Sequence, residues 1–83
     1  MKIIFKQDQY QYLQTVLSKD RVDYWEILQK GYIEQLIFDL DEDFIEELRE
    51  WCIEMQIKVG FDIEYELNDS GKILENLIDL LYR

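Results

Sequence analysis

The stretch from residue 39 to residue 59, DLDEDFIEELREWCIEMQIKV, constrains the fold more than any other part of this 83-residue chain. At 100° per residue, its apolar side chains collect on one face of a helix, about 120° wide. Several of them keep the three-and-four spacing of a seam that packs against another helix. The apolar face consists of Phe44, Ile45, Leu48, Trp51, Cys52, Met55 and Val59. This spacing predicts a central helix, over about residues 41–59, that anchors the core.

The opposite side of the predicted central helix is acidic. Its carboxylates belong to Asp43, Glu46, Glu47, Glu50 and Glu54. Residues 34–69 hold 13 acidic and 2 basic residues, whereas residues 1–33 have a net charge of +1, residues 70–83 a net charge of 0, and the whole chain −10. Like charges three or four residues apart on a helix repel by a few tenths of a kcal/mol per pair. A cationic partner would relieve this repulsion.

The remaining segments read mainly as helices. Periodicity and helix-end signals predict helices over residues 7–18, 21–30 and 72–82, and a helical segment over residues 32–40. Gly31 follows Lys30 and fits a helix end at which glycine takes the left-handed conformation. The N-terminal KIIFK, residues 2–6, fits either an edge strand or an arm that inserts its apolar side chains into the core.

One segment, residues 57–67, has two readings. Its sequence IKVGFDIEYEL alternates apolar and polar residues like a half-buried strand, but Val59 also continues the central helix as far as Gly60. We therefore expect one domain over residues 1–83 that is mostly α, a small bundle of four to five helices around the central helix. The alternative is an α+β fold with a short strand at 57–67 that pairs with residues 2–6.

The residue types argue against catalysis. The chain has no histidine, which is the commonest general base and metal ligand. Cys52 lies on the apolar face, where a thiol packs as an inert hydrophobe. The acidic run matches a calcium loop at several positions, but Phe44 stands where that loop needs glycine. We expect no enzyme activity, no catalytic residue, no cofactor and no metal.

Charge and apolar content also restrict the partners and the location. A net charge of −10 disfavours direct binding to nucleic acid or to an anionic membrane surface. A single cysteine allows no internal disulfide. No apolar run approaches the roughly 20 residues of a membrane span or the core of a signal peptide. We therefore expect a cytoplasmic protein.

These features suggest a small acidic, non-enzymatic protein-binding module. The acidic helix face would cover a basic, nucleic-acid-binding surface of a partner protein, as an inhibitor, immunity protein or antitoxin does. The predicted partner contacts are Asp43, Glu46, Glu47, Glu50 and Glu54, with Trp51 and Trp25 as apolar anchors. The alternative is a homodimeric structural or adaptor protein, closed through residues 73–82 or the seam 45–59, whose acidic face only gives solubility.

Overall fold

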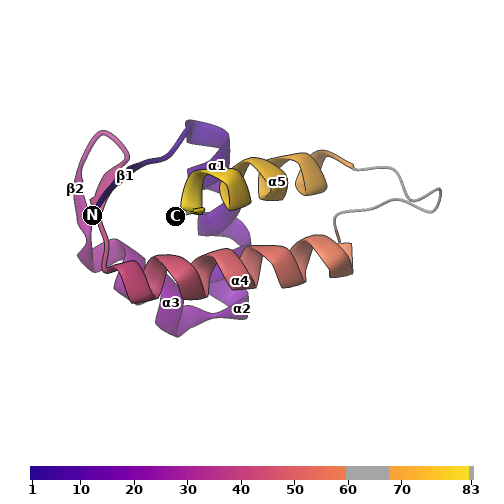
Figure 1. The fold of residues 1–83 in the computed structure, drawn as a ribbon, viewed down its shortest axis with the longest axis horizontal. Helices are drawn as coiled ribbons and strands as arrows, with labels where there is room; N and C mark the ends of the chain where they lie inside the picture. Colours follow the sequence, from indigo (N-terminus) through magenta and orange to yellow (C-terminus); the bar gives the residue numbers. More distant parts are fainter. Residues whose placement is uncertain (60–67, 83) are drawn as a thin grey trace. The chain divides into compact units, whose positions relative to one another are not determined.

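The structure is a computed structural model that describes residues 1–59 and 68–82. Over these residues the chain is mostly helical and has a small three-stranded antiparallel sheet (Figure 1), which confirms the predicted mostly-α class. The chain divides into two compact units, which we call the N-terminal unit (Met1–Glu42) and the C-terminal unit (Asp43–Arg83). A single domain over residues 1–83 stays a prediction.

The N-terminal unit contains a helical half and a sheet. The predicted helices over residues 7–18 and 21–30 are confirmed, with ends that differ by one or two residues. The first is interrupted by a turn of π-helix. In chain order the elements are β1 (Lys2–Ile4), α1 (Gln7–Tyr12), the π-helical turn η1 (Leu13–Leu17), α2 (Ser18–Asp20), α3 (Val22–Lys30), β2 (Tyr32–Glu34) and β3 (Ile37–Asp39).

Residues 32–40 form a β-hairpin, so the predicted helical segment is wrong. The loop between β2 and β3 has two residues, Gln35 and Leu36, with φ of 47° and 66°. Tight hairpin turns whose twist matches the strands need positive φ at both central positions. The Phe5 N–H donates to the Leu36 carbonyl across 3.0 Å, which ties this turn to the chain after β1. Aromatic and β-branched residues in both strands suit the pleated conformation.

The sheet has the order β1-β3-β2, so residues 2–4 form an edge strand. β1 pairs antiparallel with β3, with Ile3 opposite Phe38 and Ile4 opposite Ile37. The predicted alternative, in which residues 2–6 pair with a strand at 57–67, falls mostly on residues that the structure does not describe and stays a prediction. Residues 57–59 end a helix, and residues 60–67 lie outside the described residues.

An aromatic cluster fills the space between the sheet and the helices of the N-terminal unit. The ring of buried Phe38 lies 5.3 Å from the ring of Phe5, 5.7 Å from that of Tyr10 and 5.3 Å from that of Tyr32. Tyr10 also contacts Trp25, with ring centroids 5.8 Å apart. Edge-to-face and offset rings at such distances stabilise a core beyond the apolar area that they bury.

Gly31 joins α3 to β2 at a point where the backbone is crowded. Its φ is −84°, so the expected left-handed conformation is wrong. A Cβ at this position would lie 2.6 Å from the Asp39 carbonyl oxygen and 2.7 Å from Leu40 Cδ2. The Asp39 N–H donates to the Gly31 carbonyl across 2.8 Å. Glycine is needed here because β3 passes too close for a side chain.

The described residues of the C-terminal unit form a pair of antiparallel helices, α4 (Glu42–Val59) and α5 (Asp69–Leu81) (Figure 1). Gln56 Nε2 donates to the Gly71 carbonyl across 3.2 Å near one end of the pair. Near the other end, the Arg49 guanidinium lies 5.4 Å from the centre of the Tyr82 ring. The predicted central helix and last helix are both confirmed. α5 begins earlier than predicted because Asn68 Oδ1 accepts the Gly71 N–H across 2.7 Å as an N-cap.

Candidate protein-binding surface

α4 separates buried apolar residues from exposed acidic residues over its first three turns. Its buried side chains are Phe44, Ile45, Leu48, Trp51 and Cys52, which belong to the predicted apolar face. Met55 is half-buried and Val59 is exposed, so the buried face narrows toward the end of the helix. Desolvation raises the pKa of the Cys52 thiol from 9.0 to about 12, which keeps it protonated and unreactive near neutral pH.

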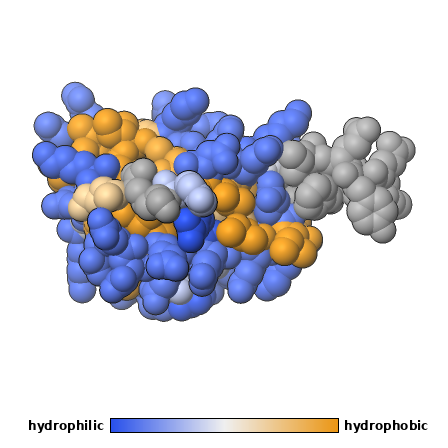
Figure 2. Space-filling view, in the orientation of Figure 1, coloured by the Kyte–Doolittle hydropathy of each residue, from blue (hydrophilic) through white to orange (hydrophobic). Residues whose placement is uncertain are grey.

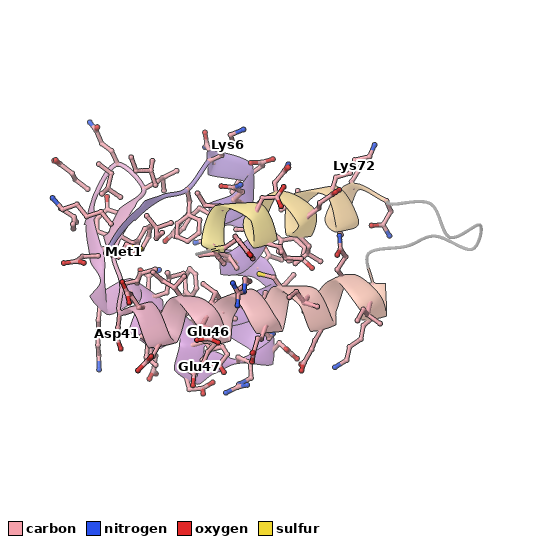
Figure 3. All side chains as sticks on the ribbon, viewed as in Figure 1. Met1, Lys6, Asp41, Glu46, Glu47 and Lys72 are labelled. Atoms are coloured by element: carbon pink, nitrogen blue, oxygen red, sulfur yellow. The ribbon has the colours of Figure 1, made fainter. Side chains whose placement is uncertain are left out.

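The outer face of α4 carries the predicted acidic residues, all of them exposed. They are Asp43, Glu46, Glu47, Glu50 and Glu54. Figure 3 shows Glu46 and Glu47 pointing away from the side of α4 on which α5 lies. At about 1.5 Å of rise per residue, the five carboxylates extend over roughly 16 Å of helix surface. This single element thus presents a row of negative charge about three turns long.

No ion pair among the described residues involves this acidic face. The ion pairs of the described residues both lie in the N-terminal unit. They join the Met1 amino group to Asp39, at 2.9 Å, and Arg21 to Asp23, at 2.8 Å. On α4 itself, Arg49 stands over the Tyr82 ring and makes no ion pair with a carboxylate among the described residues. The acidic face therefore keeps its charge for interactions with other molecules.

The outer face also holds two exposed apolar residues that the sequence reading did not assign to it. The side chains of Ile53 and Ile57 are 39% and 73% exposed. Together with Glu46 and Glu50 they follow the spacing i, i+4, i+7, i+11, which forms one stripe along a helix. We call these four residues the outer stripe. Figure 2 shows hydrophobic side chains among hydrophilic ones near the end of α4 that adjoins the grey segment.

The two predicted tryptophan anchors are less exposed than the acidic residues. Trp51 is only 5% exposed, because it lies on the apolar face of α4, so a partner cannot reach it. Trp25 is half-buried on α3 and stacks on Tyr10, whose hydroxyl accepts a hydrogen bond from Gln29 Nε2 across 3.1 Å. Trp25 therefore belongs to the aromatic cluster of the N-terminal unit, and part of its ring reaches the surface.

The acidic run does not adopt the form of a calcium loop, because it is helical from Glu42 onward. Asp39, which matched the first ligand position, accepts a hydrogen bond from the Met1 amino group. This hydrogen bond, together with the positive charge of the amino group, lowers the pKa of the Asp39 carboxyl. Within residues 1–59 and 68–82, no three Cys, Asp or Glu side chains are grouped so as to hold a metal ion.

No family model matches this chain, and neither the curated proteins nor the solved structures contain a match. Among the described helices, none combines the length and the apolar content that crossing a membrane requires. The function must therefore be inferred from the geometry and charge of the site.

Proposed function

We propose that this chain is a small, non-enzymatic protein-binding module whose acidic α4 face covers a basic surface of a partner protein. The partner surface would be one that otherwise binds nucleic acid, which makes the chain an inhibitor of the immunity-protein or antitoxin kind. Asp43, Glu46, Glu47, Glu50 and Glu54 would take the place of phosphates.

The observation that carries this proposal is a row of five exposed carboxylates on one rigid helix, without an ion-pair partner among the described residues. A fixed row of like charges costs the free protein a few tenths of a kcal/mol for each neighbouring pair. A basic partner would turn that repulsion into attraction and would be steered toward the face by its field. The helix also fixes the backbone positions of these residues, so no backbone ordering is required when the partner binds.

The test is a comparison of two charge-reversed variants in a pull-down at low salt from lysate of the cell that makes the protein. The first variant is Glu46→Lys/Glu50→Lys on the outer face of α4. The control is Glu75→Lys/Asp79→Lys on α5, in which the two exposed residues have the same spacing and the change in net charge is the same. Circular dichroism would first show that both variants keep the helix content of the wild type.

We expect one basic protein to be retained by the wild type and the α5 variant and to be lost with the α4 variant. Its affinity should fall steeply between 50 and 300 mM salt, because exposed charges are screened over about 10 Å at 0.1 M. Added nucleic acid should compete with the chain for that protein. Equal retention by all three proteins would contradict the proposal and leave the acidic face as a solubilising surface.

A homodimer is the second candidate, and apolar residues that are exposed on the sheet favour it. The seam residues Leu48 and Cys52 are fully buried within one chain and cannot close a dimer. On the outer face of the sheet, Ile4 is 63% exposed and lies opposite Ile37, and Ile33 on β2 is 46% exposed. Light scattering at tens of micromolar gives the molar mass of the wild type and of the variant Ile4→Ser/Ile33→Ser. If the sheet closes a dimer, the wild type should be dimeric and the variant monomeric.

A further inference from the structure

The outer stripe changes from acidic to apolar along one face of α4. Glu46 and Glu50 occupy its first half, and Ile53 and Ile57 occupy its second half. We propose that this stripe binds an amphipathic basic helix of the partner protein, whose cations face the two glutamates and whose apolar side chains cover the two isoleucines. This inference rests on the proposed function and specifies what the partner must present.

The exposed isoleucines are the reason to expect more than charge pairing. A face that served only to keep the chain soluble would favour polar residues at positions 53 and 57, because isoleucine there leaves apolar surface in water. Ile57 is 73% exposed and Ile53 is 39% exposed, although the other residues of the outer stripe are glutamates. Apolar side chains that leave water on binding add affinity roughly in proportion to the area that they bury, whereas solvent-exposed ion pairs add little. The two isoleucines therefore mark the anchoring part of the surface.

The spacing of the stripe favours a helix as its occupant. Residues at i, i+4, i+7 and i+11 line up along roughly 16 Å of a helix, at 1.5 Å per residue. A second helix that carries side chains with the same three-and-four spacing meets such a row at every turn. Binding through anchor residues at these spacings is a common mode of recognition for amphipathic helices.

Charge complementarity selects a basic helix over a second copy of this chain. Two copies of α4 packed in parallel would bring Glu46 against Glu46 and Glu50 against Glu50. Packed antiparallel, they would place Glu46 over Ile57 and Glu50 over Ile53, so that carboxylates would be desolvated without a partner. Each chain also carries a net charge of −10. A helix with lysine or arginine beside its apolar residues avoids both penalties.

The test uses designed peptides and the full chain. The first probe is a fluorescein-labelled 18-residue helix with four leucines at i, i+4, i+7 and i+11 and lysines on either side of them. The second probe has the same lysines, with glutamine in place of each leucine. The protein variants are Ile53→Ser/Ile57→Ser, Glu46→Lys/Glu50→Lys and, as a control for exposed isoleucine, Ile27→Ser on α3. Anisotropy at 100 mM salt gives each Kd.

We expect the leucine peptide to bind the wild type and the Ile27→Ser variant at least tenfold more tightly than the glutamine peptide does. Ile53→Ser/Ile57→Ser should remove that preference and leave the glutamine peptide unaffected. Glu46→Lys/Glu50→Lys should weaken both peptides.

Three results would overturn the inference or its basis. Equal binding of the two peptides to the wild type would refute the apolar anchor and leave the acidic docking surface standing. Binding of both peptides that does not respond to Glu46→Lys/Glu50→Lys would refute the proposed function itself. A wild-type dimer that Ile53→Ser/Ile57→Ser converts to a monomer would identify a second copy as the occupant and would refute the basic helix.

Discussion

The two units of the chain are held together in different ways. In the N-terminal unit, strands and aromatic rings that are far apart in sequence contact one another. The backbone also restricts which residues fit at Gly31, Gln35 and Leu36. The C-terminal unit consists of two helices whose leucines and isoleucines repeat every three or four residues, and its described residues show no positive φ. Stability therefore depends on a few demanding positions in the first unit and is spread over many similar packing positions in the second.

The largest expected effect comes from opening a cavity in the repeating core of the C-terminal unit. Leu77 on α5 is fully buried, so Leu77→Ala should lower the free energy of unfolding by about 3 kcal/mol. The neighbouring exposed residue supplies a control, since Asn76→Ala should change it by less than about 0.5 kcal/mol. Urea denaturation measures both values. A loss below 1 kcal/mol for Leu77→Ala would show that this core is loosely packed.

A smaller loss is expected from adding a single methyl group in the N-terminal unit. Gly31→Ala would place a Cβ against the Asp39 carbonyl oxygen, so it should cost about 2 kcal/mol through a forced backbone shift. Lys30→Ala, at the preceding exposed position, should have little effect. Equal stabilities for these two variants would mean that β3 moves aside freely, and the first unit would then tolerate changes at Gly31 as the second unit does at its surface.

The two tryptophans allow each unit to be followed separately in these experiments. Trp25 lies in the N-terminal unit and Trp51 in the C-terminal unit. Trp51→Phe leaves fluorescence from the first unit alone, and Trp25→Phe leaves fluorescence from the second. Coincident unfolding midpoints would support the predicted single domain, because a two-state transition gives the same curve with every probe. Separate midpoints would show two independent units.

Alkaline pH should weaken the C-terminal unit through Cys52. In the folded chain the thiol has a pKa of about 12, whereas its ordinary value is 9.0. The unfolded chain therefore loses this proton first, and stability falls as the pH rises from 9 toward 12. Between pH 8 and pH 10 the loss should be about 1 kcal/mol greater for the wild type than for Cys52→Ala. Parallel pH profiles for the two proteins would show that Cys52 is not desolvated.

The smallest expected effect is a gain in stability at the hairpin turn. Gln35 has a φ of 47°, which costs an ordinary L-residue about 1 kcal/mol and glycine almost nothing. Gln35→Gly should therefore stabilise the chain by about 0.5 kcal/mol, after the greater entropy of the unfolded glycine is subtracted. Gln11→Gly, inside α1, should instead destabilise it by about 1 kcal/mol. A loss at both positions would contradict the assigned turn geometry.

The same contrast explains which parts of the fold could be predicted. α4 and α5 repeat their apolar residues over several turns, so periodicity alone predicts them. The β2–β3 hairpin was missed because its turn is Gln35-Leu36, which lacks the Asn-Gly or Asp-Gly signal of such turns. With that signal absent, Tyr32, Ile33, Leu36 and Ile37 matched a helical face equally well.

The candidate site was predictable in its charge but not in its apolar part. Acidic residues opposite an apolar seam must lie on the outer face of a helix, and all five are exposed as expected. Trp51 belonged to that seam, so its burial excludes the role of an anchor. Ile57 was read as part of an alternating, strand-like run, and Ile53 lay between polar neighbours. The predicted helix over residues 41–59 already aligns both with Glu46 and Glu50, but the strand-like alternative for residues 57–67 left Ile57 unassigned until α4 was confirmed to Val59.

The position of β1 has a consequence for how the protein is made. Of the three described strands, β1 comes first along the chain, and its partner among them, β3, comes last, at residues 37–39. Ile3 and Phe5 are therefore not covered by β3 while the helical segments of residues 7–30 and β2 are synthesised. The β2–β3 hairpin closes locally, whereas docking β1 requires a loop of more than 30 residues to close at an entropic cost. Pairing of β1 with β3 is thus a late step in folding. Until that pairing forms, the nascent chain exposes a short, unpaired strand that can aggregate.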